Sequence, residues 1–187
     1  MRIISGALKG KSINFLKNST TRPLKDNVRE NIFNIINHSN LISINLKNSK
    51  VLDAYSGVGS FGVECLSRGA KQVTFVEKDQ NASKILRENL MLLSITERAT
   101  VFKNTIEKFL EDKKKEKYSL FFFDPPFSNN TFIQNLIFIK KNRMYESNHI
   151  IILHRERKSN DNLKDYIDTI FTKQYGRSKI IFGFFTK

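Results

Sequence analysis

Residues 50–69, "KVLDAYSGVGSFGVECLSRG", contain a short apolar run, a glycine-rich turn and a second apolar segment in immediate succession. The run at 50–55 predicts a buried strand. Apolar residues at 60–69 recur at helical spacing, and Gly69 marks the point where that helix should stop. A strand that passes through a tight turn into a helix is the building unit of α/β sheets. We therefore expect this stretch to begin such a sheet.

Strand-like and helix-like segments keep alternating after residue 69. The predicted strands lie at 72–77, 99–103, 118–124, 149–154, 169–175 and 179–185, and the predicted helices at 79–93, 105–117 and 130–141. Apolar runs without polar alternation are typical of strands that are covered on both faces. Gly176 joins the last two strands tightly, which makes them antiparallel. The sequence thus predicts an α/β, doubly wound domain with a mostly parallel, seven-stranded sheet.

Residues 1–37 have a different pattern and are predicted to form a small extension, with the main domain at 38–187. Residues 2–15, "RIISGALKGKSINF", alternate loosely and contain two glycines, which suits a short hairpin. Residues 21–37 have a proline near their start and apolar residues along one helical face. The extension is also basic, since its seven Lys or Arg residues outnumber its two acids.

The whole chain is strongly basic. Lys plus Arg total 32 and Asp plus Glu total 18, a formal net charge of +14. Such an excess favours a polyanionic partner such as nucleic acid, because each cation near a phosphate releases condensed counterions. A surplus that only aids solubility is the alternative. The run "EDKKKEK" at 111–117 is better explained as a solvated helix end than as a binding patch.

Cysteine and histidine usage argues against a metal protein. The single cysteine, Cys65, excludes an internal disulfide and a cysteine-based zinc site, and its context suits the buried face of a helix. His38, His149 and His154 lack metal-ligand spacing. No apolar stretch approaches ~18 residues, and the start "MRIISGALKG" lacks the apolar block of a signal peptide. We therefore expect a cytoplasmic protein without a membrane span or a metal.

Gly57, Gly59 and Gly62 stand between the first predicted strand and helix in the spacing G-x-G-x-x-G. Such glycines let the backbone approach a ligand closely, and the helix start offers free amide donors. Glu77 ends the second predicted strand, 20 residues after Gly57, where a carboxylate can accept two ribose hydroxyls. Nicotinamide cofactors and S-adenosylmethionine both carry such a ribose, so these residues leave both open. A ligand-free turn is disfavoured because Glu77 occupies the ribose position.

Asp53 favours S-adenosylmethionine over a nicotinamide cofactor. It lies inside the strand end, four residues before Gly57. A carboxylate there suits the ammonium of the cofactor's amino-acid portion, whereas it would repel the pyrophosphate of a dinucleotide. The chain also has no further site suited to a nicotinamide and a small substrate.

The tetrapeptide "DPPF", residues 124–127, follows another predicted strand. Pro125 and Pro126 cannot donate backbone hydrogen bonds, so the sheet must stop there. Asp124 and the Pro125 carbonyl could each accept one N–H of an exocyclic base amine. Phe127 could stack on the base, a contact worth ~1–3 kcal/mol in comparable cases. An isolated D-P-P is often only a strand stop, but here it accompanies the glycine turn and its two acids.

With these motifs the chain resembles class I S-adenosylmethionine-dependent methyltransferases of the amino-methylating (N/D)-P-P-(Y/F) type, which have a Rossmann-like fold. More closely, it resembles the bacterial RsmD family, which methylates the exocyclic N2 amine of a guanine in 16S ribosomal RNA. The resemblance spans essentially the whole chain. It rests on "MRIISGALKGKSI", "TRPLKDNVRENIFNII", "VLDAYSGVGSFGVECLSRGA", "FVEKD" and "FFFDPPF", with "YGRSKIIF" as a weaker match. The two amino-terminal segments narrow the resemblance from superfamily to family.

The resemblance implies a role for each candidate site residue. The implied catalytic residues are Asp124, Pro125, Pro126 and Phe127. The implied cofactor-binding residues are Asp53, Ser56, Gly57, Gly59, Glu77, Lys78 and Asn104, with Asn104 at the adenine. The implied RNA-binding residues are Arg2, Lys9, Lys11, Arg22 and Arg29. A helix-surface ion pair explains Arg29 equally well. The implied partner is ribosomal RNA or the assembling small ribosomal subunit, and we expect a monomer.

Two departures from the family pattern concern RNA docking. Leu24 stands where the family usually has a small hydroxyl residue, and lysines in "LKGKSI" replace arginines, which keeps charge but loses bidentate phosphate binding. Three alternatives belong to other classes: a DNA adenine or cytosine amino-methyltransferase, a nicotinamide-dependent oxidoreductase and a non-catalytic RNA-binding module. The absence of a sizeable target-recognition domain in 187 residues argues against the first. The intact motif set argues against the last.

Overall fold

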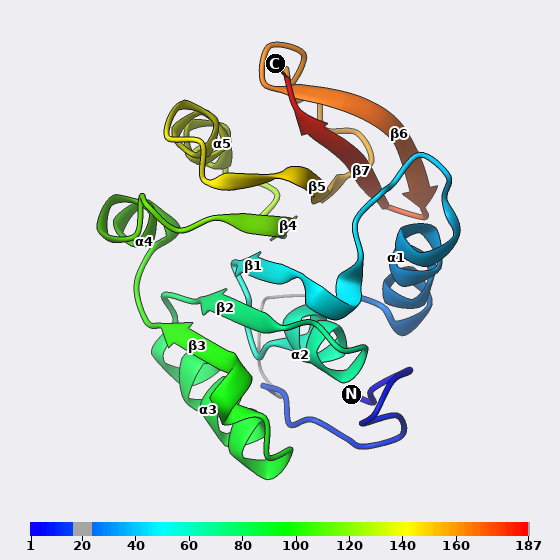
Figure 1. Cartoon of the computed structure of the whole chain (residues 1–187), viewed down its shortest axis with the longest axis vertical. Coiled ribbons are helices and arrows are strands. Elements are labelled where there is room, and N and C mark those ends of the chain that lie inside the picture. The colour runs from blue at the N-terminus through cyan, green and yellow to red at the C-terminus, as the bar shows by residue number, and fades with distance from the viewer. Residues whose placement is uncertain (17–23, 187) are drawn as a thin grey trace.

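The computed structural model describes residues 1–16 and 24–186, which build one seven-stranded sheet in the order β3-β2-β1-β4-β5-β7-β6 (Figure 1). The strands are β1 Lys50–Ala54, β2 Gln72–Val76, β3 Ala99–Phe102, β4 Tyr118–Phe123, β5 Tyr145–Glu156, β6 Ile167–Tyr175 and β7 Ser178–Phe185. Strands β1 to β5 pair in parallel, while β7 is antiparallel to both β5 and β6. The predicted mostly parallel α/β sheet is thereby confirmed.

Helices cover both faces of this sheet. They are α1 Asp26–His38, α2 Ser60–Ser67, α3 Gln80–Leu92, α4 Ile106–Asp112 and α5 Phe132–Lys141, with short 3₁₀ turns at Leu46–Asn48 and Thr96–Arg98. Figure 1 shows α4 and α5 on one side of the sheet and α1 and α2 on the other. Buried side chains of α3 belong to the same core cluster as those of α1 and α2. The fold is therefore a doubly wound, three-layer arrangement.

The apolar strands form this arrangement because successive side chains enter opposite layers. Val51 packs with the α1–α3 layer and Leu52 with the α4–α5 layer. In β4, Leu120 and Phe122 face the first layer while Phe121 and Phe123 face the second. Each fully buried side chain of this kind contributes about 1.5–3 kcal/mol. Strands without a polar face are therefore stable only at the centre of a covered sheet, and β1 and β4 lie there.

The amino-terminal segment forms the short hairpin that the sequence predicts, and this hairpin packs on α2. Its two arms pair antiparallel around Arg2 and Ser12, where Ile3 N donates to the Lys11 carbonyl at 2.9 Å and Ile13 N donates to the Met1 carbonyl at 2.8 Å. The backbone N–H groups of Ile4 and Ser5 donate to the buried Glu64 carboxylate of α2, at 2.9 and 3.0 Å. The hairpin is therefore bonded both within itself and to α2, and its buried residues Ile3 and Ile13 belong to the α1–α3 layer. The boundary at residues 37 and 38 stays a prediction.

Candidate active site

Three carboxylates lie at the carboxyl ends of three neighbouring strands. Asp53 is in β1, Glu77 follows β2, and Asp124 follows β4. Because β1 lies between β2 and β4 and all three are parallel, these ends meet at one edge of the sheet. In doubly wound sheets this edge is where ligands bind. The structure thus brings together residues that are up to 71 positions apart in the sequence.

The glycines of the β1–α2 turn have different tasks. Gly57 and Gly59 both have a left-handed backbone, with φ of +55° and +88°. A Cβ on Gly59 would approach Leu86 Cδ1 to 2.4 Å, and one on Gly62 would approach Phe75 Cε1 to 2.3 Å. A Cβ on Gly57 would meet nothing within 4 Å. Gly59 and Gly62 therefore allow close packing of the helix layer, whereas Gly57 leaves open space beside the backbone.

Glu77 connects the glycine turn to the start of α3. Its carboxylate accepts hydrogen bonds from Gly57 N at 2.8 Å and from Asp79 N at 2.7 Å. Ser56 is buried, and its hydroxyl donates to the Val76 carbonyl at 3.3 Å. These bonds fix the turn against the end of β2. The side chain at Glu77 is therefore held beside Gly57, on the open side of the turn.

The buried Asp53 carboxyl makes this edge attractive to a cation. One of its oxygens accepts a hydrogen bond from Gly62 N at 2.9 Å. Burial raises the pKa of Asp53 from its ordinary value of 3.8 to about 8, and the neighbouring charges of Asp124 and Glu77 also raise it. A positively charged ligand would stabilise the ionised form of Asp53 and lower its pKa again, whereas a pyrophosphate would raise that pKa further. The electrostatics thus suit a cationic ligand.

The tetrapeptide Asp124–Phe127 begins where β4 ends. Asp124 is partly exposed, and its Oδ1 lies 2.8 Å from Nδ1 of His154. Pro125 is buried, while Pro126 is exposed and Phe127 is 38% exposed. The Phe127 ring meets the His154 ring edge-on at 5.6 Å between centroids. A carboxylate and an accessible aromatic ring therefore stand side by side at the edge that carries Asp53.

The sequence similarity to known proteins extends over almost the whole chain. A family model described as "conserved hypothetical protein 95" matches residues 1–184. A protein named "Ribosomal RNA small subunit methyltransferase D" from Buchnera aphidicola is 30% identical over 99% of this chain and 91% of its own length. Its namesake from Haemophilus influenzae is 32% identical over 84% and 79%. The chain belongs to the RsmD family of methyltransferases.

Solved structures agree with this membership. The structure of yhhF from Escherichia coli superposes with a TM-score of 0.82 at 25% identity, covering 98% of this chain and 96% of that one. A structure from Haemophilus influenzae superposes with a TM-score of 0.78 at 27% identity, covering 97% and 96%. The seven-stranded fold of this RsmD-family chain is therefore the fold of its relatives.

The remaining predicted cofactor residues of the RsmD-family chain lie around the glycine turn. Lys78 is exposed directly after Glu77. Asn104 is exposed just after β3, and its side-chain oxygen accepts a hydrogen bond from Thr105 N at 2.8 Å. Strand β3 pairs with β2, so Asn104 and Glu77 follow neighbouring strand ends. The geometry is compatible with both predicted roles, which stay predictions.

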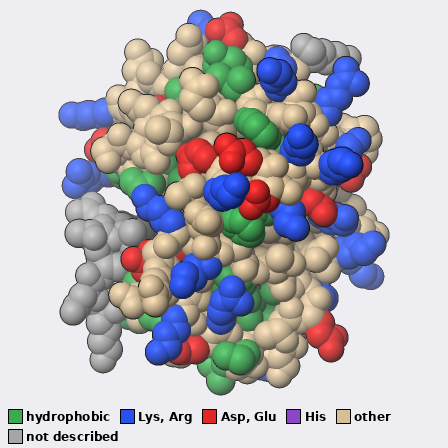
Figure 2. Space-filling view, turned by 90° about the vertical axis from the view of Figure 1, so that its left-hand side faces the viewer, with side chains coloured by type: hydrophobic (Ala, Val, Ile, Leu, Met, Phe, Trp, Pro, Cys, Tyr) green, Lys and Arg blue, Asp and Glu red, His purple; other side chains and the backbone are tan. Residues whose placement is uncertain are grey.

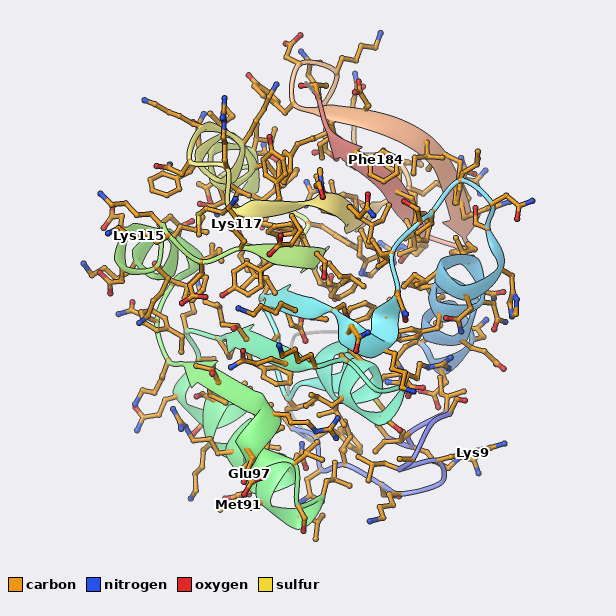
Figure 3. All side chains as sticks on the ribbon, in the orientation of Figure 1. Lys9, Met91, Glu97, Lys115, Lys117 and Phe184 are labelled. Atoms are coloured by element: carbon orange, nitrogen blue, oxygen red, sulfur yellow. The ribbon has the colours of Figure 1, made fainter. Side chains whose placement is uncertain are left out.

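The predicted RNA-binding residues do not share one environment. Arg2, Lys9 and Lys11 are exposed, and Figure 3 shows Lys9 on the amino-terminal segment, at the outside of the molecule. Arg22 lies outside the described residues. Arg29 needs correction as a surface contact, because its side chain is only 1% exposed and donates to the Arg2 carbonyl at 2.7 Å and to Asp26 at 3.0 Å. Arg29 therefore holds the amino-terminal segment on α1, and its own side chain has almost no exposed surface that RNA could contact.

Two residues of this site have no motif in the sequence. His154 and Arg155 end the apolar part of β5, and both contact the tetrapeptide. The available signal was positional: polar residues follow a buried run in the strand next to β4.

A second unpredicted feature is Tyr55, a non-glycine residue with φ of +70° directly after β1. Its hydroxyl accepts a hydrogen bond from Asn135 of α5 at 3.0 Å.

The part of the chain that the structure describes lacks metal-binding clusters and membrane-spanning helices. Residues 1–16 and 24–186 contain no group of three or more His, Cys, Asp or Glu side chains that could hold a metal ion. No helix in the same ranges is long and apolar enough to cross a membrane. Cys65 is buried, and burial raises the pKa of its thiol well above the ordinary value.

Proposed function

We propose that this RsmD-family chain transfers a methyl group from S-adenosylmethionine to the exocyclic N2 amine of a guanine in 16S ribosomal RNA. The observation that carries the proposal is the position of Asp124–Phe127 at the end of β4, beside the glycine turn and the Asp53 and Glu77 carboxylates. The names of the relatives, ribosomal RNA small subunit methyltransferase D, support the choice of substrate. The proposed partner is ribosomal RNA or the assembling small subunit, bound by a monomer.

The residues present fit S-adenosylmethionine. This cofactor supplies a methyl group on a positively charged sulfur, and it also carries an ammonium group. Burial raises the pKa of the free Asp53 carboxyl, and the ammonium would stabilise its ionised form when bound, while the open space beside Gly57 admits the methionine part. Glu77 would accept the ribose hydroxyls, as its position beside Gly57 favours. Ser56, Lys78 and Asn104 complete the proposed cofactor site.

The tetrapeptide would prepare the amine for reaction. The lone pair of an exocyclic base amine is delocalised into the ring, so the nitrogen is a poor nucleophile. Asp124 and the Pro125 carbonyl each accept one N–H, which favours a pyramidal nitrogen with a localised lone pair. Phe127 stacks on the base, and the prolines keep the acceptors in place so that little reorganisation is needed. As the new C–N bond forms, the bond between the methyl carbon and the positively charged sulfur would break and leave a neutral thioether, and the surplus proton of the nitrogen would pass to Asp124.

Replacement of Asp124 tests the proposal. Asp124→Ala is expected to lower methyl transfer from labelled S-adenosylmethionine to unmodified 16S ribosomal RNA by at least about 10²-fold, because the amine loses its acceptor. Binding of S-adenosylhomocysteine, measured by calorimetry, should persist. A folded Asp124→Ala protein that methylates at the wild-type rate would contradict the catalytic assignment.

The same preparation distinguishes the alternatives. Mapping the labelled base is expected to identify guanine N2. Transfer to DNA adenine or cytosine instead of RNA would support a DNA amino-methyltransferase. Thermal stabilisation by NADH and not by S-adenosylhomocysteine would support an oxidoreductase. RNA binding with no transfer to any nucleic acid would support a non-catalytic module.

A further inference from the structure

Arg155 of β5 is a buried cation that binds the backbone of the tetrapeptide. Its side chain is 1% exposed, and Nη1 and Nη2 donate to the carbonyls of Pro126 and Phe127 at 3.3 and 3.2 Å. Nε and Nη2 also donate to the Asp161 carboxylate, each at 3.1 Å. The guanidinium lies 4.5 Å from the centroid of the Phe132 ring. One planar cation thus connects the tetrapeptide, the segment after β5 and the start of α5.

Such a residue is poorly explained by stability alone. A buried charge loses its hydration, and its partners often do no more than offset that cost. What Arg155 provides is geometry, since its fork of N–H groups fixes two successive carbonyls at once. A strand stop needs no such support, because the two prolines already end the pairing. The arrangement indicates that the exact course of the loop matters.

His154, the preceding residue, binds the Asp124 side chain. Its Nδ1 lies 2.8 Å from Asp124 Oδ1, and because a carboxylate can only accept, the ring proton belongs on Nδ1. Nε2 is buried and has no hydrogen-bond partner within residues 1–16 and 24–186. Asp124 Oδ2 likewise receives no hydrogen bond from these described residues, although the side chain is 24% exposed. One carboxylate oxygen is therefore held and the other stays free.

The two residues support the loop from both faces of the sheet. Successive side chains of a strand point to opposite sides, so His154 and Arg155 approach the tetrapeptide from different layers. Arg155 contacts Phe132, which belongs to the α4–α5 layer. His154 lies two and four positions after Ile152 and Ile150, so its side chain points to the same face of the sheet as theirs. Ile150 and Ile152 belong to the α1–α3 layer. A single dipeptide at the end of β5 thereby fixes both the loop backbone and the side chain that the loop presents.

We propose that His154 and Arg155 are positioning residues for methyl transfer. His154 holds Oδ1 of Asp124 so that Oδ2 faces the incoming amine, and Arg155 fixes the carbonyls that follow Pro125. This inference rests on the proposed function, in which Asp124 accepts the amine N–H. Neither residue touches cofactor or base in this scheme. Their loss should therefore lower kcat, while the KM for S-adenosylmethionine and the affinity for S-adenosylhomocysteine stay unchanged.

The His154 series tests this inference with a matched control in the same strand. His154→Ala is expected to lower kcat on unmodified 16S ribosomal RNA between about ten- and a hundredfold, because a displaced acceptor is misaligned. His154→Asn, whose amide can donate to Asp124, should recover most of the loss. His149→Asn is the control: His149 is buried in β5, but its ring bonds to Glu146 O and Phe185 N, away from the tetrapeptide. It should keep the wild-type kcat.

Arg155→Lys extends the test without removing the charge that pairs with Asp161. Lysine cannot donate to two carbonyls in a planar fork, so kcat should fall about tenfold or more with unchanged cofactor KM. Wild-type kcat in folded His154→Ala and Arg155→Lys, together with an inactive Asp124→Ala, would overturn the positioning roles and leave the proposed function standing. Wild-type kcat in Asp124→Ala would overturn the proposed function itself. If His154→Ala does not fold, unchanged kcat in a folded His154→Phe protein would overturn the inference, and a selective loss of kcat in that protein would support it.

Discussion

The Asp53 carboxyl is buried beside two other acids, and it carries a proton in the folded protein at pH values where an unfolded chain has lost it. Burial raises its pKa from 3.8 to about 8, with Asp124 and Glu77 adding to the shift. Between about pH 4 and pH 8 the folded state therefore binds more protons than the unfolded state. The contribution of Asp53 to stability must fall as the pH rises through that window.

Asp53→Asn should remove this pH dependence. The amide oxygen can still accept the hydrogen bond from Gly62 N, and the group no longer ionises. Wild type and variant should have similar melting temperatures below about pH 4, with the variant increasingly more stable as the pH rises toward 8. Scanning calorimetry across this range measures the difference. A difference that stays constant with pH would show that Asp53 does not titrate in this window.

Single residues also show what the sequence could reveal about the site. Asp53, Glu77 and Asp124 could be proposed because each follows or ends an apolar run beside a glycine or proline motif. His154 and Arg155 could not, since a lone histidine and arginine after a strand match no motif. Arg29 was misplaced for a related reason. Its burial depends on Arg2 and on Glu64 of α2, which lies 3.9 Å away in space but 35 positions along the chain.

At the scale of elements, the β1–α2 turn combines tight packing with an open ligand side. Gly57 and Gly59 share a left-handed backbone but differ in what surrounds them. Alanine in that conformation costs roughly 1–2 kcal/mol at either position. At Gly59 the new methyl group would also collide with Leu86, and overpacking typically adds about 1–3 kcal/mol.

This pair of glycines gives a prediction with a built-in comparison. Gly59→Ala should lower the free energy of unfolding clearly more than Gly57→Ala, because only the former meets the α3 side chain. Gly57→Ala should instead weaken S-adenosylhomocysteine binding, since its methyl group occupies the open space of the proposed site. Urea denaturation and calorimetric titration provide the two measurements. Equal stability losses, or unchanged affinity in Gly57→Ala, would contradict these assignments.

Whether a segment forms a strand or a helix was predictable where its own pattern of apolar residues agrees with its packing in the fold. The runs that became β1, β2 and β4 are mostly apolar without regular polar alternation, and only a sheet covered on both faces can bury them. Agreement is weaker at element ends. The predicted helix 105–117 stops at Asp112, before a basic run whose mutual repulsion opposes a further helical turn. The amino-terminal hairpin was predicted, but no local pattern indicated that its backbone N–H groups at Ile4 and Ser5 donate to Glu64 of α2.

At the scale of the whole molecule, positive charge is distributed and not confined to one element. The formal net charge is +14. Figure 2 shows the side of the molecule that lies at the left of Figure 1, where Lys and Arg side chains are spread over the surface with acidic side chains among them. Exposed lysines also lie at Lys9 and Lys11 of the amino-terminal segment and at Lys114 and Lys115 beyond α4. Figure 3 places Lys9 and Lys115 at opposite sides of the molecule.

RNA affinity should depend on the amino-terminal lysines and not on charge in general. Lys9→Gln with Lys11→Gln is expected to weaken binding of 16S ribosomal RNA and to reduce the slope of log K against log salt by about 0.7–0.9 for each lost phosphate contact. The matched variant Lys114→Gln with Lys115→Gln removes the same charge beside α4 and should leave the slope unchanged. Filter binding at several salt concentrations measures both. Equal losses in the two variants would indicate that net charge alone attracts the RNA.

The strand order has a consequence for synthesis on the ribosome. Strand β6 precedes β7 in the chain but lies outside it, and all its pairing is with β7. While the chain is being made, β6 therefore emerges before the only strand that it pairs with in the described sheet. Until β7 follows and pairs with β5, the β5 edge and the whole of β6 expose unpaired backbone groups. This interval is the time at which the nascent chain is most exposed to incorrect pairing with other chains.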